Sequence, residues 1–273
     1  MRATLIALGF ELEQTDHEDA NGQYEINYRF DDALAAADRY MLFKVAAHAI
    51  AEKHAMVFSC MAKPFANTPG SGLHFHLSLR DAAGKAVMAD AHGALGLSAT
   101  GHQFAAGLLH HADALAALCA PTVNSYKRLA SSASLSGTSW SPVWKTLGNN
   151  NRTCLVRTVA GRIEWRLPDP SCNVYAALAA TLASGLDGMA RSLPAVAAHN
   201  EDLYERKAAG AVMPDTLPRD LLDALRALDS NQVLTERLGA AFVEQFLQCK
   251  YEEWDAYVAH VSNWELERYA DAF

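Results

Sequence analysis

The sequence lacks several features that mark specialised classes of protein. No apolar run reaches the roughly 20 residues that a membrane-spanning helix needs. The N-terminus has no basic segment followed by an apolar core and a small-residue cleavage site, so we expect no secretory signal. The chain also has no Pro-, Gly- or Ser-rich linker and no internal repeat. We therefore expect one domain over residues 1–273.

Cysteine and basic residues are both sparse. The five cysteines are odd in number and contain no CxxC pair. This argues against a disulfide framework and a zinc site and favours a reducing cytoplasm. The 31 acidic residues outnumber the 23 basic ones and give a net charge of -8, and the basic residues are scattered. We therefore expect neither nucleic acid nor a membrane as a partner.

The chain does contain enough apolar residues for a substantial core, because 51% of its 273 residues are apolar. Alternating patterns predict strands over residues 9–15, 22–30, 56–63, 72–80, 152–159 and 161–167. Helical periodicity predicts helices over about 31–51 and 101–118. A further helix is predicted after Pro170 and Ser171, and several more from Pro218 to the end. This mixture of elements predicts an α+β fold.

Three of the predicted strands have a chemically equipped face. Each alternates apolar residues with polar ones, so the polar side chains of a strand share one side. The polar sets are His74, His76, Ser78 and Arg80; Gln23, Glu25, Asn27 and Arg29; and Arg162, Glu164 and Arg166. One such face is typical of an ordinary half-exposed strand. Three faces rich in Glu, His and Arg are harder to explain in that way.

A divalent metal and ATP are the chemistry that these faces favour. If they line one concave sheet, the ligand set is oxygen-rich and suits Mg²⁺ or Mn²⁺ better than zinc. Its members are Glu18, Glu25, His74 and Glu164. Arginines beside such a metal are typical of phosphoryl transfer, in which charge on the phosphate oxygens must be neutralised. The chain has no GxxxxGK(S/T) loop, and its comparable loop, NTPGSG, by itself indicates only a turn.

Five segments give a more specific indication. In order they are HEDANGQYE, KPFANTPGSGLHFHLSL, PTVNSYKRL, NNRTCLVR and GRIEWRLPDPSCNVYAALAATLASGLDG. Over about residues 9–188 this order resembles the glutamine synthetase family. The spacing of TVNSYKR, SGTSWSP and NNRT is most similar to the type III-like branch that includes γ-glutamylmethylamide synthetases.

The resemblance implies both a fold and an activity. The fold is α+β, with a curved and mainly antiparallel sheet and helices packed on its outer face. The activity is that of an ATP-dependent ligase joining ammonia or a small amine to the γ-carboxylate of L-glutamate through a γ-glutamyl phosphate. Mg²⁺ or Mn²⁺ and a homo-oligomeric assembly are implied as well.

The resemblance also implies roles for individual residues. Glu18 and Glu25 match one metal site, and His74 and Glu164 match a second. The positions that match contacts to ATP are Glu13, Phe30, His76, Ser78, Arg157 and Arg162. The positions that match contacts to glutamate or the transferred phosphoryl group are Gly70, Arg128, Arg152 and Arg166, with Arg128 and Arg152 as catalytic residues. Phe30 and Arg157 break the two-residue alternation with Glu25 and Arg152, so a bulge or strand end must intervene.

Three features depart from the family pattern. Ser134 stands where the family usually has a glutamate that takes a proton from the amine, so we hypothesise that methylamine or a similar alkylamine is accepted beside ammonia. Pro69 replaces an asparagine that helps to hold the substrate, which removes a side-chain amide. The family's small β-grasp domain and a strand with two further metal-binding glutamates are absent. We therefore expect residues 1–273 alone to bind metal or ATP weakly and to show little ligase activity.

Two other classes of function stay open. A truncated paralogue could bind nucleotide or a partner without catalysis, although the retained carboxylates and arginines argue against long decay. A phosphagen-type kinase would also surround ATP with arginines on a curved sheet. The order of the motifs disfavours the kinase, and failure to phosphorylate guanidino compounds would separate the two.

Overall fold

The computed structural model spans residues 1–273, of which residues 1–130 and 140–273 are described. Its strands form two sheets. Strands β1 (Leu12–His17) and β2 (Tyr24–Tyr28) make an antiparallel pair. The second sheet has the order β3-β6-β5-β4, from β3 (Phe75–Leu77), β4 (Leu147–Asn149), β5 (Val156–Val159) and β6 (Arg162–Trp165). Among these strands β4 and β5 pair in parallel and the other neighbours are antiparallel, which confirms the mainly antiparallel α+β class.

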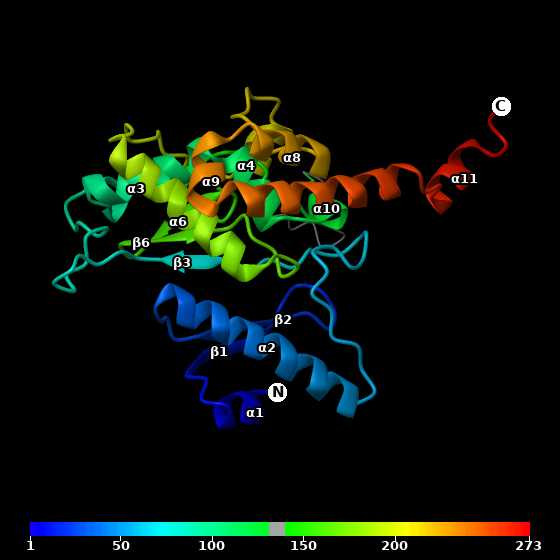
Figure 1. The fold of residues 1–273 in the computed structure, drawn as a ribbon, viewed down its shortest axis with the longest axis horizontal. Coiled ribbons are helices and arrows are strands. Elements are labelled where there is room, and N and C mark those ends of the chain that lie inside the picture. The colour runs from blue at the N-terminus through cyan, green and yellow to red at the C-terminus, as the bar shows by residue number, and fades with distance from the viewer. Residues whose placement is uncertain (131–139) are drawn as a thin grey trace.

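Helices cover the second sheet on one side. The helical elements are α1 (Arg2–Ala7), α2 (Ala33–Lys53), η1 (Ala94–Gly96), α3 (Ala99–His110), α4 (Ala112–Cys119), α5 (Val123–Arg128), α6 (Val174–Ala190), α7 (Leu203–Ala208), α8 (Leu221–Asp229), α9 (Gln232–Leu238), α10 (Ala240–Val258) and α11 (Asn263–Tyr269). Figure 1 shows α3, α4, α6, α8, α9 and α10 on one side of the layer made by β3 and β6, and α1, α2, β1 and β2 on the other. Within the described ranges, no helix combines the length and the apolar character needed to cross a membrane.

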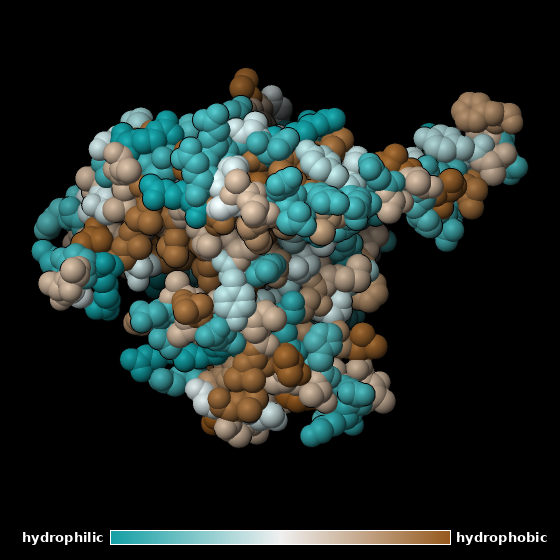
Figure 2. Space-filling model, viewed as in Figure 1, coloured by the Kyte–Doolittle hydropathy of each residue, from teal (hydrophilic) through white to brown (hydrophobic). Residues whose placement is uncertain are grey.

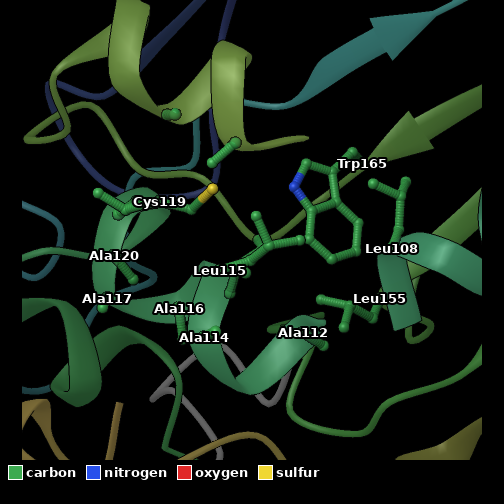
Figure 3. Packing of buried hydrophobic residues seen from close by; sticks show 14 of the residues in the cluster. Leu108, Ala112, Ala114, Leu115, Ala116, Ala117, Cys119, Ala120, Leu155 and Trp165 are labelled. Atoms are coloured by element: carbon green, nitrogen blue, oxygen red, sulfur yellow. The ribbon is translucent and has the colours of Figure 1, made fainter. Parts of the chain in front are cut away.

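The main core lies between β6 and the helices. Ile163, Trp165 and Leu167 alternate along and just beyond β6, and all three are fully buried. Figure 3 shows Trp165 packed beside Leu115, with Leu108 and Leu155 nearby. Burial of an aromatic side chain of this size contributes roughly 3–5 kcal/mol, judged by the cost of its truncation. Because neighbouring residues of a strand point to opposite faces, this packing directs Glu164 and Arg166 away from the helices.

A second, smaller core supports the N-terminal part of the chain. It contains Leu5 of α1, Ala46 of α2, and Phe10, which lies between α1 and β1. Partly buried side chains of β1 and β2 pack against this core. Apolar residues remain exposed on this part, and Figure 2 shows them around α1 and α2, with others at α11. The N-terminal hairpin is therefore less deeply buried than the second sheet.

One predicted strand is wrong. Residues 56–63 form no strand, although their composition suits one. Their backbone groups bond elsewhere, because the Lys63 N–H donates to the Asn124 side chain at 2.8 Å and the Lys63 carbonyl accepts from it at 2.9 Å. The Ala62 carbonyl accepts from the Ser71 N–H at 2.8 Å. These side-chain and loop partners take the place of a strand ladder at Ala62 and Lys63.

Other boundaries differ from the sequence predictions. The helix predicted over 101–118 is divided into α3 and α4 at His111, whose buried ring lies 2.9 Å from Asp187 Oδ2 and 2.9 Å from Asn231 Nδ2. Strand β4 and helices α5 and α7 were not predicted. The helix after Ser171 and the helices of the C-terminal tail are confirmed as α6 and α8–α11.

Candidate active site

Glu164 lies at the centre of the candidate site. Its side chain is 4% exposed, and its two oxygens have different partners. Oε1 accepts a hydrogen bond from Arg166 Nη1 at 2.8 Å, and Oε2 accepts one from Arg157 Nη1 at 2.8 Å. Burial alone would raise the pKa of Glu164, but His74 and the two guanidinium groups outweigh it and hold that pKa well below its usual range. Glu164 therefore stays ionised in the folded chain.

His74 contacts the same carboxylate from the neighbouring strand region. Its Nδ1 lies 3.1 Å from Glu164 Oε1. Burial and the positive charge of Arg166 lower the pKa of His74 to about 4, so the imidazole is neutral at pH 7. A neutral imidazole can bind a metal. In the structure this nitrogen is in hydrogen-bond contact with the carboxylate, so the two residues offer donor atoms that Mg²⁺ or Mn²⁺ can accept while their present partners are each other and the arginines.

Gly72 is needed for the position of His74. A Cβ at this residue would lie 2.6 Å from His74 Nε2 and 2.9 Å from Arg128 Nη2. Real Cβ atoms do not approach other atoms so closely. The absence of a side chain at Gly72 therefore leaves room for the His74 ring and the Arg128 guanidinium group to pack directly against the backbone of Gly72.

Glu18 and Glu25 form a second pair of acidic groups, on the β1–β2 hairpin. Burial and the neighbouring Glu25 raise the pKa of Glu18. Burial opposes ionisation of Glu25 too, but hydrogen bonds from Glu18 and Asn27 outweigh it and lower the pKa of Glu25. The two carboxyl groups thus affect each other's ionisation, and a divalent cation between them would relieve the repulsion of two carboxylates.

The four predicted metal ligands form two neighbouring pairs. Glu25 interacts electrostatically with both His74 and Glu164, so the pairs face each other. Across the described residues, however, no three His, Cys, Asp or Glu groups already stand together as a metal site. The donor atoms therefore suit Mg²⁺ or Mn²⁺ in type, while their present partners are arginines and one another.

The arginines predicted to hold glutamate differ in their surroundings. Arg128 is 5% exposed and donates to the backbone carbonyls of Leu167 at 2.8 Å and Arg166 at 2.9 Å. Burial lowers its pKa to about 10, which leaves it charged at pH 7. Arg152 is exposed and lies over the ring of Trp140, 5.0 Å from its centroid.

Arg166 and Gly70 complete this part of the site. Arg166 Nη2 donates to the Trp140 carbonyl at 3.1 Å, and its buried Nε has no hydrogen-bond partner in the described part of the chain. Gly70 accepts from Gln23 Nε2 at 3.0 Å. A Cβ on Gly70 would lie 2.7 Å from the Ala62 carbonyl and 2.8 Å from Arg128 Cγ. The glycine loop therefore packs directly against Arg128.

A cleft of about 580 Å³ lies next to this region and contains part of the predicted ATP site. Phe30 and Ser78 line it, together with three arginines that had no predicted role: Arg29, Arg39 and Arg80. Glu13 does not line the cleft, whereas Glu11 does, and β1 has a register shift between Leu12 and Gln14. Glu11, Asp31 and Asp32 also line the cleft, and two of the arginines are ion-paired there, Arg29 with Glu11 at 2.9 Å and Arg39 with Asp31 at 2.7 Å. The cleft thus combines one exposed aromatic ring with a balanced set of charged groups.

Three of the remaining predicted ATP contacts, His76, Arg157 and Arg162, take part in side-chain hydrogen bonds. Arg162 Nε donates to His76 Nδ1 at 3.1 Å, and burial lowers the pKa of His76. Arg157 Nε donates to Asn150 Oδ1 at 3.1 Å while its Nη1 bonds Glu164. Both arginines are therefore oriented before any ligand binds.

Strand ends explain the broken alternation in the sequence. Phe30 lies beyond the end of β2 at Tyr28, and Arg152 lies before β5 begins at Val156. The predictions missed Gln23, Asn150 and Trp140 as partners of site residues. Gln23 was visible on a polar strand face, but nothing in the sequence pattern pairs Asn150 or Trp140 with its arginine. Ser134, the predicted departure at the amine position, falls outside the described residues.

The fold and the site define an α+β protein that gathers carboxylates, a histidine and arginines on one face of its sheets. Comparison with known proteins identifies the family to which this chain belongs. The family described as "Glutamine synthetase, catalytic domain" matches residues 1–269. The chain belongs to the glutamine synthetase family.

Individual relatives agree with this assignment. The chain is 47% identical to the glutamate–methylamine ligase of Methyloversatilis universalis, over 99% of this chain and 62% of that protein. It is 42% identical to a glutamine synthetase of Rhizobium leguminosarum, over 98% of this chain and 62% of the relative. It also matches a solved structure described as a GmaS/ADP complex, with a TM-score of 0.92 and 43% identity over 99% of this chain and 62% of the other. The chain thus spans 62% of the length of these relatives.

Proposed function

We propose that residues 1–273 form one catalytic domain of a ligase that uses ATP to join ammonia or a small alkylamine to the γ-carboxylate of L-glutamate. The observation that carries this proposal is that positively charged guanidinium groups and an imidazole surround the carboxylate of Glu164. Arg157 and Arg166 donate to this carboxylate, and His74 lies beside it. Such an arrangement suits a metal ion and phosphate oxygens at the same time. The names of the relatives support the same reaction.

A divalent metal belongs to this proposal. Glu18 and Glu25 are the proposed holders of one Mg²⁺ or Mn²⁺ ion, and His74 and Glu164 those of another. The interaction between the carboxyl groups of the first pair, which raises the pKa of Glu18, and the direct contact between the members of the second support the assignment. When bound, the metal would neutralise charge on the phosphate oxygens of ATP. Family resemblance also supports a homo-oligomeric assembly, which light scattering would check.

The arginines are proposed to bind the two anionic substrates. Arg152 and Arg166 are assigned to glutamate and to the phosphoryl group in transfer, and the Nε of Arg166, which has no partner among the described residues, is the proposed donor to it. Arg128 is assigned to the same site as the group that holds the carbonyl of Arg166. Gly70 keeps the loop close to Arg128. A site fixed in advance lowers the barrier, because little reorganisation is needed during the reaction.

The nucleotide is assigned to the neighbouring cleft. Phe30 offers a ring for the base, and Ser78 lines the same wall. His76 is proposed to orient Arg162, while Arg157 connects the phosphate region to Glu164. Glu13, the remaining predicted contact, lies on the adjacent strand β1. The γ-carboxylate of glutamate then attacks the γ-phosphorus of ATP, which releases ADP and forms the γ-glutamyl phosphate.

The acceptor amine is the second part of the reaction. An uncharged amine attacks the acyl carbon, forms the amide bond and displaces phosphate. We propose methylamine beside ammonia, because a glutamate–methylamine ligase is 47% identical to this chain and Ser134 offers no carboxylate. The loss of the side-chain amide at Pro69 also belongs to this proposal, as a change in how glutamate is held.

A single-turnover assay tests the proposal. The chain, in excess over labelled ATP, is mixed with Mg²⁺ or Mn²⁺, L-glutamate and either ammonium or methylammonium, and products are identified by mass spectrometry. We expect slow formation of ADP together with glutamine or γ-glutamylmethylamide. Arg152→Gln should abolish product, whereas Arg268→Gln, at an exposed position of α11, should not. ATP binding without any amide product would favour the non-catalytic nucleotide-binding class instead.

A further inference from the structure

The two residues Trp140 and Ser141 contact all three arginines assigned to glutamate. The Trp140 ring lies under Arg152, with 5.0 Å from the guanidinium carbon to the ring centroid. The Trp140 carbonyl accepts from Arg166 Nη2 at 3.1 Å. Ser141 Oγ donates to the backbone carbonyl of Arg128 at 2.6 Å.

The segment is held from behind by a small hydrophobic cluster. Tyr204 OH donates to the Ser141 carbonyl at 2.8 Å, and the Tyr204 ring packs edge-on against Trp144 at 4.9 Å. Trp144 is 2% exposed and belongs to a cluster with Val143, Cys154 and Leu203. The segment is therefore anchored to packed structure, although the Trp140 side chain itself is 44% exposed.

The contact with Arg152 has a clear physical basis. Arg152 is a long, exposed side chain, and a free arginine samples many rotamers that a substrate must restrict on binding. A guanidinium group is attracted to the face of an indole ring, and tryptophan is the strongest aromatic partner for a cation. The ring thus holds Arg152 in a single region before glutamate arrives.

We propose that Trp140 is a positioning residue for glutamate binding. Its ring orients Arg152 and its backbone carbonyl orients Arg166, so that both guanidinium groups address the same anionic substrate. This inference rests on the proposed function, because it assumes that these arginines bind glutamate. A substitution of the Trp140 side chain removes the ring contact with Arg152. It leaves the hydrogen bond to Arg166 in place, because every variant keeps the backbone carbonyl.

The glutamate affinity of three variants tests the inference, measured by titration of the chain in the presence of Mg²⁺ and ADP. Trp140→Leu should weaken glutamate binding about two- to five-fold, the effect of a cation–π contact at an exposed site. Trp140→Phe should weaken it less, because a ring remains. ADP affinity should not change. Trp264→Leu, at an exposed tryptophan of α11, is the matched control and should bind glutamate as the unmodified chain does.

A double-mutant cycle shows whether Trp140 acts through Arg152. In an Arg152→Gln background, Trp140→Leu should cause no further loss of glutamate affinity. An equal loss in both backgrounds would show that the tryptophan acts through the general fold and would overturn the inference.

A spectroscopic measurement separates this inference from the proposed function. The Arg152 Nε–H resonance should be shifted by the indole ring current, and Trp140→Leu should remove the shift whether or not glutamate is present. An unmodified chain that binds no glutamate contradicts the proposed function and the inference with it. Glutamate binding that is unaffected by Trp140→Leu contradicts the inference alone.

Discussion

The two sheets carry the two halves of the candidate site in opposite ways. On β6, Glu164 is almost fully buried and has three cationic or imidazole partners. On the β1–β2 hairpin, Glu25 is exposed and its main carboxyl neighbour is Glu18. In the second sheet, folding itself pairs the charge of Glu164 with nearby guanidinium groups. On the hairpin, two carboxyl groups lie near each other, and a proton or a bound cation is needed to neutralise them.

This difference follows from what lies behind each strand. Trp165 and Ile163 pack into the main core, so the backbone of β6 is rigid and its polar residues have defined positions. The hairpin packs on the small cluster of Leu5, Phe10 and Ala46. A part of the molecule with few buried contacts opens more readily. The arginine half of the site is thus preorganised, and we expect the carboxylate pair to adjust when a metal binds.

The largest expected effect is on stability and compares the two glutamates directly. Glu164→Gln leaves two buried guanidinium groups without their counter-ion and should lower the free energy of unfolding by about 3–5 kcal/mol. Glu25→Gln, the matched substitution on the hairpin, should change it by no more than about 0.5 kcal/mol. Urea denaturation of both variants measures the difference. Equal effects would show that the two halves are not distinct.

Glycine substitutions sharpen the comparison at the level of the backbone. Gly72→Ala places a Cβ against His74 and Arg128 and should cost about 1–3 kcal/mol, because the buried guanidinium group of Arg128 must move. Gly22, in the turn of the hairpin, has open space around it but a φ of +77°. Gly22→Asn should therefore be nearly neutral, since asparagine tolerates this conformation. Thermal unfolding would test both, and tolerance of Gly72→Ala would contradict the packing described for His74.

The third prediction concerns pH. The unfolded chain protonates His74 near pH 6.5, whereas the folded chain does so only near its lowered pKa of about 4. The unfolded state therefore binds more protons in this window, and stability should fall as the pH drops from about 6.5 to 4. The low pKa of Glu164 extends the loss to more acidic pH in the same direction.

His74→Gln should remove part of this dependence, on the order of 1 kcal/mol between pH 7 and pH 4.5 because the side chain is partly solvated. His92→Gln, at an exposed loop position, serves as the control. Urea midpoints measured at several pH values provide the test. An unchanged slope in His74→Gln would show that the imidazole contributes no acid sensitivity.

The smallest expected effect is stabilisation by metal. Mg²⁺ or Mn²⁺ at a concentration equal to its dissociation constant should stabilise the chain by about 0.4 kcal/mol. Glu25→Gln should abolish this gain, because it removes one member of the proposed carboxylate pair, and Asp90→Asn should keep it. Calorimetry with and without metal detects the shift. Stabilisation that survives in Glu25→Gln would assign the ion to another site.

The strand faces were predictable because alternation is a local property. The pattern of GRIEWRL was enough to place Glu164 and Arg166 together, opposite Trp165. The pattern of GLHFHLSLR likewise separated His74 and His76 from the apolar residues. Residues 56–63 show the limit of such reasoning, because their backbone bonds depend on the side chain of Asn124, 61 residues from Lys63, and on a loop contact with Ser71.

The partners of the site residues were less predictable for the same reason. The contact of Arg157 with Asn150 spans a turn, and the contact of Gln23 with Gly70 spans 47 residues. Neither has a period that a pattern could reveal. The division of the predicted helix at His111 also depends on distant side chains, Asp187 and Asn231.

Local alternation in the amino-acid sequence is enough to place side chains on a shared strand face, and the order of the motifs indicates the family. Only the tertiary structure decided which charges are paired and which are left to a ligand. It buried Glu164 between arginines and left Glu25 beside Glu18. The reason is that charge pairing depends on distance and burial, and both are set by packing between segments far apart in the chain.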